Sequence, residues 1–356
     1  MPVQTANEPL TVDSVPSIEA IWQEWSELAE RGDNLFLTPE WLSIWWRHYG
    51  GGKDLCLKAC RDNKGRLVAL LPLYRWRRRP RVLRFLGHGP SDELGPVCAP
   101  DDRERASACL ARALEQARGE MLLADYLPGD SDWLGWLPGS RLLGREASPV
   151  IEYEDSSWDD FLRARSRNLR TQVRKRERAL RRDFEVSFRL SDPDSLATDI
   201  DLLFRLHRAN WSKKQPPTDF VGRDEDFQRE FIAAAQARGW LRLWIMELDG
   251  RPAAAGLGYR FAGSEYSYQS GRDPAWDRFS VGSVLRVHAI QAALEGGAHK
   301  FRFLRGAEPF KYRFASKDDA LVTLALPRGV VGRAALVGAT ALLKTKKSLR
   351  PLLRRG

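Results

Sequence analysis

The segment RFSVGSVL, which starts at Arg278, combines residue types that can hold a phosphate where a helical pattern begins. Gly282, Ser280 and Ser283 are small, so an anion can approach the backbone N–H groups at a helix N-terminus, where the helix dipole favours negative charge. Arg272 and Arg278 add positive charge on the N-terminal side. These residues predict a phosphate-binding helix start. The alternative is an ordinary Ser280 N-cap, with Gly282 serving only the packing.

A similar helix in the first half of the chain starts differently. It begins with PDDRERAS, whose carboxylates suit the positive end of their own helix dipole. The second helix starts without an acidic residue, so its N-terminus is left for an external anion. The contrast favours a ligand at the second helix and not at the first.

Both halves show strand patterns, then a helix, then another strand. In the first half these patterns span 55–60, 66–76, 81–88, 102–119 and 120–128. In the second half they span 240–248, 251–263, 264–273, 280–297 and 298–306, with a tight hairpin signal at Asp249-Gly250. An offset of about 180 residues with one element order predicts a tandem duplication. We expect an α/β protein with domains at 1–150 and 151–328 and an apolar, then basic tail at 329–356.

Composition narrows the class of protein. The formal charge of +10 and the pI near 9.6 favour anionic partners such as phosphates, nucleic acid or acidic lipid. Four cysteines at irregular spacing predict neither a disulfide framework nor a metal site. The first residues lack the pattern of a secretory signal, and no apolar run reaches the ~18 residues of a membrane span, so the expected location is the cytoplasm.

Several blocks occur in a distinctive order: FLTPEWLSIWWRHYG, RFLGHGPSDELGPV, SRNLRTQVRKRERALRRDFEVSF, ELDGRPAAAGLGY, YSYQSGRDPAWDRFSVGSVL and FRFLRGAEPFKYRF. In these blocks the chain resembles the CelD/BcsL-type (BioF-like) acetyltransferases of the GNAT superfamily, which are related to the FemABX aminoacyltransferases. The resemblance covers residues 30–325. It implies tandem GNAT-like units, each a mixed, mostly antiparallel sheet flanked by helices. Three positions depart from the family pattern: Arg278 lies four residues before Gly282 instead of three, Val284 replaces a second glycine or alanine, and Phe310 replaces a tyrosine before Lys311.

The resemblance implies direct transfer of an acyl group, expected to be acetyl, from acetyl-CoA or another acyl-CoA, without a metal. The acceptor would be an amine or hydroxyl on a sugar or a cell-envelope or exopolysaccharide precursor, such as a nucleotide- or lipid-linked sugar. The expected donor-binding residues are Gly271, Arg272, Arg278, Ser280, Val281, Gly282, Ser283 and Val284.

Glu308 and His207 are the candidate general bases. Each has a structural alternative, a loop salt bridge of Glu308 with Lys311 or Arg305 and a core position for His207. The expected acceptor-binding residues are Asp92, Trp211, Tyr268 and Lys311. For Asp92, a turn-forming role is the competing interpretation.

The run at 163–182 holds ten Arg or Lys residues against one Glu, with a narrow apolar stripe that predicts a docked helix. Such a helix could bind a nucleotide-sugar, a lipid pyrophosphate or the acceptor arm of a tRNA, or simply face solvent. The tail could lie on an anionic membrane, at its inner face, or pack on the body. Two other functions stay open: a FemABX-like transferase that uses aminoacyl-tRNA, and a non-catalytic, degenerate GNAT protein that binds polysaccharide or nucleic acid.

Overall fold

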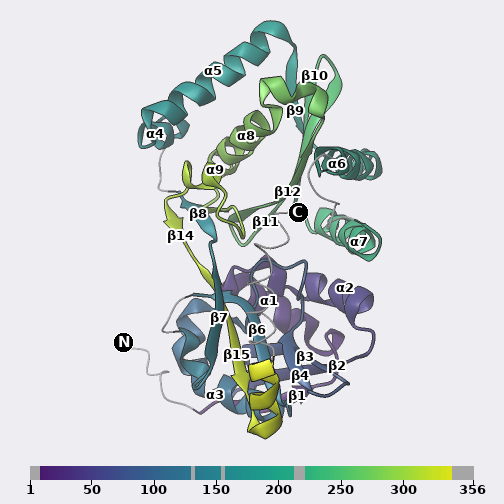
Figure 1. Ribbon diagram of the computed structural model, residues 1–356, viewed down its shortest axis with the longest axis vertical. Coiled ribbons are helices and arrows are strands. Elements are labelled where there is room, and N and C mark those ends of the chain that lie inside the picture. The colour runs from purple at the N-terminus through teal and green to yellow at the C-terminus, as the bar shows by residue number, and fades with distance from the viewer. Residues whose placement is uncertain (1–8, 130–132, 154–156, 212–220, 339–356) are drawn as a thin grey trace, which may run out of the picture. The chain divides into compact units, whose positions relative to one another are not determined.

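The computed structural model describes residues 9–129, 133–153, 157–211 and 221–338. The chain divides into two compact units, which are coloured along the sequence in Figure 1. Unit 1 comprises Met1–Arg145 and Leu321–Gly356, and unit 2 comprises Glu146–Ala320. Each unit is built on one β-sheet with helices packed against it, as the sequence predicted for an α/β protein.

In the described part of unit 1, eight strands form a sheet in the order β1-β2-β3-β4-β6-β15-β7, with β5 paired to β3. The strands are β1 (Thr11–Val15), β2 (Lys53–Arg61), β3 (Leu67–Trp76), β4 (Val82–Phe85), β5 (Val97–Cys98), β6 (Met121–Pro128), β7 (Arg141–Glu146) and β15 (Leu321–Pro327). The labelled helices are α1 (Trp22–Gly32), α2 (Pro39–Tyr49) and α3 (Arg103–Gln116). Thr38 caps α2, because its hydroxyl accepts a hydrogen bond from the backbone N–H of Trp41.

In the described part of unit 2, seven strands form a sheet in the order β14-β8-β13-β12-β11-β10-β9. The strands are β8 (Pro149–Glu152), β9 (Val186–Leu190), β10 (Leu241–Leu248), β11 (Arg251–Phe261), β12 (Ser264–Arg272), β13 (Lys300–Arg302) and β14 (Lys317–Asp318). The helices are α4 (Trp158–Arg163), α5 (Arg167–Asp183), α6 (Leu196–Trp211), α7 (Arg223–Ala237), α8 (Val281–Glu295) and α9 (Pro309–Tyr312). Helix α8 covers one face of this sheet, and α6 and α7 cover the other (Figure 1).

The two units share one topology. In unit 1, β2, β3 and β4 are successively antiparallel, and α3 then connects β4 to the parallel strand β6. In unit 2, β10, β11 and β12 follow the same antiparallel order, and α8 connects β12 to the parallel strand β13. Asp249 and Gly250 both have positive φ at the β10–β11 hairpin, as a tight turn requires. The structure thus confirms the tandem units expected from the element order.

The strand β15 corrects the expected domain boundary. The sequence prediction assigned 321–328 to the second domain, but β15 pairs antiparallel with β6 in the sheet of unit 1. Its side chains Leu321, Val322, Leu324 and Ala325 are buried, so an apolar strand that is distant in sequence completes the first core. At the other boundary, β8 begins at Pro149 and belongs to the sheet of unit 2.

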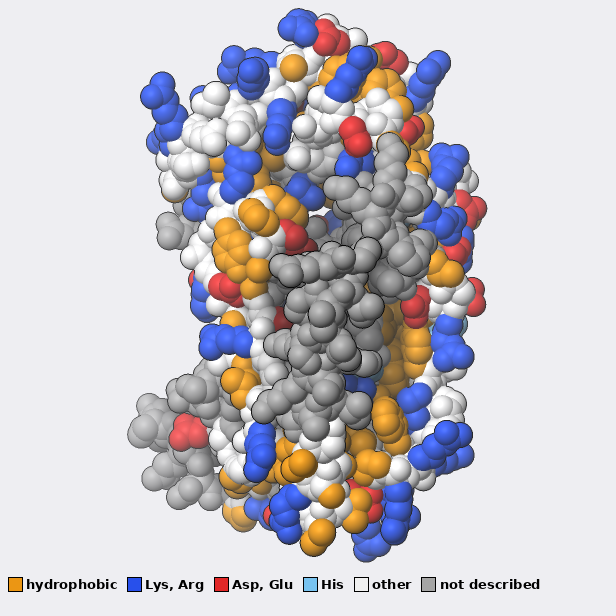
Figure 2. All heavy atoms as spheres, viewed as in Figure 1, with side chains coloured by type: hydrophobic (Ala, Val, Ile, Leu, Met, Phe, Trp, Pro, Cys, Tyr) orange, Lys and Arg blue, Asp and Glu red, His pale blue; other side chains and the backbone are white. Residues whose placement is uncertain are grey.

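Residues 167–182 of the basic run form one helix, α5, as predicted. Helix α4 ends at Arg163, and α5 starts after Ser166, whose hydroxyl accepts a hydrogen bond from the backbone N–H of Leu169. The predicted apolar stripe is confirmed, because Leu169, Val173 and Leu180 are buried. Figure 2 shows Lys and Arg side chains gathered over the part of unit 2 where α5 lies.

Part of the C-terminal tail packs on unit 1. Residues 329–338 form a helix, and Leu336 is buried in a small apolar cluster with Val82, Met121 and Ala325. The membrane contact expected for the tail also involves residues 339–356, which lie outside the described residues. No helix in the described ranges is long and apolar enough to cross a bilayer.

Candidate functional site

The strand β12 has a backbone edge that its parallel neighbour does not cover. It pairs with β13 only over Ser264–Tyr266 but continues to Arg272, where it is still paired with β11. The second half of β12 therefore has a ladder partner on one side only. The chain continues from this uncovered end of β12, at Arg272, to the start of α8 at Val281.

The start of α8 lacks the usual capping interactions. Ser280 occupies the N-cap position with φ of 57°, and its side chain makes no capping hydrogen bond. No acidic residue lies in the first turn of α8, whereas α3 has Glu104 in its first turn and is preceded by Asp101 and Asp102. The predicted contrast between the two helices is confirmed, and a Ser280 side-chain cap is not formed. The first N–H groups of α8 therefore lack both a side-chain acceptor and a local carboxylate.

The packing of the protein does not require glycine at position 282. A Cβ atom added to Gly282 would meet Cδ of Arg272 at 3.5 Å, an ordinary contact with a flexible side chain. Glycine in a helix costs about 0.5–1 kcal/mol relative to alanine, so some other benefit must favour it here. Close approach of an external group to the backbone would be such a benefit.

The packing does require glycine at position 271. A Cβ atom on Gly271 would lie 2.4 Å from the backbone N of His207 and 2.6 Å from the carbonyl carbon of Leu206. Helix α6 therefore packs directly on the backbone of β12 at this point. The glycine is explained by this helix contact, and a role beside the thioester stays a prediction.

The other residues predicted at the donor site have different surroundings. Val281 and Val284 are buried in a core cluster with Leu285 and Met246. Val281 is fully buried, so only its backbone groups can face a ligand, whereas Val284 also lines the pocket described below. Two cations flank the segment: Arg272 forms an ion pair with Asp277 at 2.7 Å, and Arg278 is exposed, with its guanidinium 4.5 Å from the Phe279 ring centroid.

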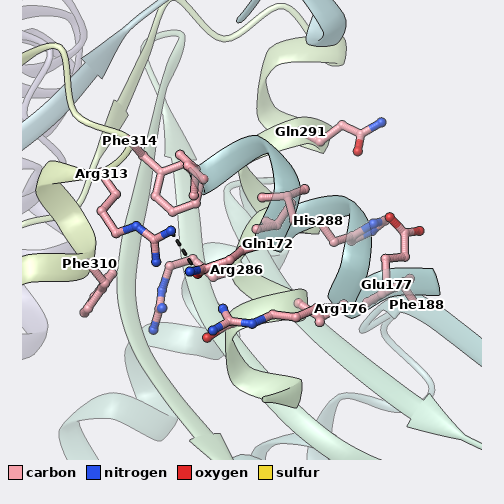
Figure 3. Close-up of a pocket in the computed structure, with 15 residues that line it drawn as sticks. Gln172, Arg176, Glu177, Phe188, Arg286, His288, Gln291, Phe310, Arg313 and Phe314 are labelled. Carbon is pink, nitrogen blue, oxygen red and sulfur yellow. Dashed lines mark hydrogen bonds between the residues drawn. The ribbon is translucent and has the colours of Figure 1, made fainter. Parts of the chain in front are cut away.

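A pocket of about 620 Å³, which includes its open mouth, lies between α5 and α8 (Figure 3). Ser283 and Val284 from the first turn of α8 line it. The polar lining residues are Gln172, Arg176, Glu177, Arg286, His288, Gln291 and Arg313. Three arginines face one carboxylate here, so the pocket beside the helix start is positively charged.

His207 lies on α6 against the end of β12. Its side chain is almost fully buried, at 1% exposure, and Nδ1 lies 3.0 Å from the carbonyl oxygen of Ser270. A carbonyl oxygen only accepts hydrogen bonds, so Nδ1 carries a proton, and in the neutral form of the ring the lone pair is on Nε2. This buried position fits both interpretations of His207, as a general base and as a residue of the core.

Glu308 and Lys311 are brought together at the start of α9. Nζ of Lys311 lies 2.9 Å from Oε2 of Glu308 and donates to the carbonyl oxygens of Leu304 and Arg305. These three acceptors use all the protons of the buried ammonium group. The contacts form the loop salt bridge that was the alternative for Glu308, while its role as a base and the predicted acceptor contact of Lys311 remain untested.

The remaining predicted acceptor residues are dispersed. The hydroxyl of Tyr268, on β12, accepts a hydrogen bond from Nε2 of Gln228 on α7. Trp211 is the last residue of α6, and its side chain lies outside the described residues. Asp92 is half-buried in the loop between β4 and β5 of unit 1, so its acceptor role stays a prediction.

Two ionisable groups in unit 2 were not predicted. Glu265 on β12 is 5% exposed, and burial raises the pKa of its carboxyl to about 7, despite the positive charges of Arg242 and Arg260. Arg286 on α8 lines the pocket, and the sequence signal for it was an arginine inside the apolar run VLRVHAI. In the described part of the chain, no group of three or more His, Cys, Asp or Glu residues is arranged to hold a metal ion.

Comparisons with known proteins agree with this architecture. Residues 167–312, from α5 to α9, match the family model described as an acetyltransferase (GNAT) domain. The structure of FemX aligns with a TM-score of 0.63 at 13% identity, over 89% of this chain and 97% of that chain. A conserved protein of unknown function from Bacteroides thetaiotaomicron aligns with a TM-score of 0.58 at 12% identity, over 90% of this chain and 100% of that chain.

At such identities the structural likeness establishes the fold alone. The chain has a tandem GNAT-like fold similar to that of FemX, and residues 167–312 of its second unit match the GNAT domain model. A search of the curated proteins gives no significant match.

Proposed function

We propose that the protein is an acyl-CoA-dependent acyltransferase, with acetyl-CoA as the expected donor. The pyrophosphate of the donor would accept hydrogen bonds from the free N–H groups at the start of α8, around Gly282. The thioester would lie beside the uncovered end of β12, at Gly271 and Arg272. The matched GNAT domain spans all of these residues and supports the proposal.

The observation that carries this proposal is the glycine at position 282. Alanine would fit there, the segment has no acidic residue, and the Ser280 side chain does not cap the helix. Ser280 itself has a left-handed backbone, a conformation that costs about 1–3 kcal/mol and is often found at ligand-binding segments. These four features together favour an external anion at the helix start.

The reaction would be a direct transfer. The acceptor nitrogen or oxygen attacks the thioester carbonyl carbon, the C–S bond breaks, and CoA leaves as the thiol after protonation. A backbone N–H on the uncovered edge of β12 can stabilise the oxyanion. We propose His207 as the base that accepts the proton of the nucleophile, because its ring lies beside Ser270 and has its lone pair on Nε2. Glu308 is the second candidate.

We propose an acceptor among sugars or cell-envelope and exopolysaccharide precursors, as the CelD/BcsL-type resemblance implies. The formal charge of +10 supports an anionic acceptor, such as a sugar linked to a nucleotide or to a lipid pyrophosphate.

The test is turnover with separated products. Purified protein would be incubated with acetyl-CoA and a panel of amino sugars and nucleotide-linked sugars, with free thiol and acetylated acceptor measured in parallel. The proposal predicts equal amounts of both products with at least one acceptor class. Failure of acetyl-CoA and of longer acyl-CoAs to bind in a calorimetric titration would exclude the proposed donor.

The outer face of α5 favours a second candidate, a FemABX-like transferase that uses aminoacyl-tRNA. Its exposed cations are Arg167, Arg174, Lys175, Arg178, Arg181 and Arg182. Such a surface can neutralise phosphates, and its affinity for RNA would fall steeply with salt. Binding of aminoacyl-tRNA that is sensitive to salt and to Glu substitutions on this face, without acyl-CoA binding, would favour this second function.

A further inference from the structure

Two arginines in the pocket between α5 and α8 have no anionic partner. Arg176 comes from α5 and Arg286 from α8, and both line the pocket (Figure 3). Within the described part of the chain, neither side chain forms a hydrogen bond or an ion pair. Unpaired guanidinium groups at a pocket wall leave strong, directional donors available to a ligand.

The environment of Arg286 makes its charge costly. The side chain is half-buried, and its guanidinium carbon lies 3.8 Å from the centroid of the Phe310 ring. Burial lowers the pKa of Arg286 to about 10, although the negative charge of Glu308 acts in the opposite direction. A bound anion would replace the lost solvation of this cation.

A third arginine is held in place across the pocket. Arg313 donates a hydrogen bond to Oε1 of Gln172 at 2.9 Å, which ties α5 to the segment that follows α9. The acidic lining residue is Glu177, and its carboxylate is already paired with Arg181 at 3.0 Å. The pocket therefore carries a positive charge that its own carboxylate does not offset.

The rest of the pocket wall is apolar or aromatic. The apolar lining residues are Leu169, Val173, Phe188, Val284, Val287, Phe310 and Phe314. The ring of His288 stacks on Phe188 at 4.0 Å between centroids, burial lowers the pKa of His288, and its Nε2 atom is buried without a hydrogen-bond partner among the described residues. The pocket therefore offers apolar and aromatic contacts beside its arginines.

We propose that this pocket binds an organic phosphate, with the phosphate at Arg176 and Arg286 and its apolar or aromatic part against the phenylalanine side chains. A phosphate monoester carries nearly two negative charges at neutral pH, which matches two unpaired guanidinium groups. The site adjoins the helix start proposed for the pyrophosphate, because Ser283 and Val284 line the pocket, whereas Ser280 and Gly282 do not.

The probe for this site is phenyl phosphate, compared with inorganic phosphate by calorimetric titration of the full chain. The variant Arg286→Leu removes the half-buried charge. The matched control Arg205→Leu removes an exposed arginine of α6 that does not line the pocket. We expect phenyl phosphate to bind more tightly than inorganic phosphate, and R286L to weaken it about tenfold to a hundredfold, as loss of a charge-assisted hydrogen bond does. R205L should bind like the wild type.

Acetyl-CoA titrations separate the possible sources of the phosphate. Competition between acetyl-CoA and phenyl phosphate would identify the site as part of the donor site, and simultaneous binding would identify a separate phosphorylated ligand. Both outcomes support a phosphate site. Absence of saturable phenyl phosphate binding, or equal affinity in folded R286L, would overturn it. Phenyl phosphate binding without acetyl-CoA binding would retain this site and reject the proposed function.

Discussion

Lys311 is a buried cation whose Nζ atom lies 2.9 Å from Oε2 of the half-exposed Glu308. The same ammonium group donates to the carbonyl oxygens of Leu304 and Arg305, where Leu304 has a left-handed φ of 62°. One side chain thus stabilises a strained loop at the end of β13, next to the pocket. Lys311 therefore has a structural role in this loop, which is distinct from the role as a general base considered for Glu308.

Lys311→Met should destabilise the protein by about 3 kcal/mol, because it leaves two backbone carbonyls and a carboxylate without their cation. Glu308→Gln removes only the half-exposed partner and should cost less than about 1 kcal/mol. Urea unfolding of both variants measures the difference. A K311M protein as stable as the wild type would contradict this role.

His207→Asn should lower the rate of acyl transfer by about 10²–10⁴-fold while acetyl-CoA affinity stays within about threefold. Asparagine can still donate a hydrogen bond to the Ser270 carbonyl but cannot accept the proton. The matched control is His299→Asn, in unit 2 beside Ser264 at the other end of β12. If H207N retains full turnover and E308Q loses it, Glu308 is the base instead.

Gly271→Ala should destabilise the protein by about 2 kcal/mol or more, because its Cβ would collide with the backbone of α6. Gly282→Ala should change stability by less than about 1 kcal/mol, in either direction, since the added methyl group has room. Thermal unfolding of the two variants side by side checks this. Equal destabilisation would mean that packing also explains Gly282.

Glu265→Gln should stabilise the protein at pH 8 and have little effect at pH 4. Burial raises the pKa of this carboxyl from 4.5 to about 7 in the folded protein. The folded state therefore retains a proton that the unfolded state loses, and wild-type stability falls as pH rises from 4.5 through 7. The difference between E265Q and the wild type should grow by about 3 kcal/mol over this range, measured by urea unfolding. A stability difference between E265Q and the wild type that does not change with pH would contradict the raised pKa of Glu265.

Local patterns predicted the elements that carry the site. Apolar periodicity and the small residues located the start of α8, and Asp249-Gly250 located the hairpin, because both signals depend on neighbours in the sequence. The absence of a carboxylate in the first turn of α8 was likewise readable from the sequence.

Contacts between distant segments could not be predicted in the same way. The pairing of β15 with β6 joins strands almost two hundred residues apart, so no local pattern indicates it. The backbone contact of His207 with Gly271 depends on how α6 packs, and the unpaired charge of Arg286 becomes evident only when α5 covers α8. The sequence therefore indicated which segment could bind a phosphate but not the pocket beside it.

The most direct measurement is a calorimetric titration of the wild type, Gly282→Ala and Gly282→Glu with acetyl-CoA. A carboxylate at position 282 would place negative charge where the pyrophosphate is expected, while alanine adds only a methyl group. We predict saturable binding by the wild type, about tenfold weaker binding by G282A because its methyl group lies where the pyrophosphate approaches the backbone, and at least about a hundredfold loss in folded G282E. Wild-type protein that gives no saturable heat, or G282E that binds as tightly as the wild type, would contradict a donor at the start of α8.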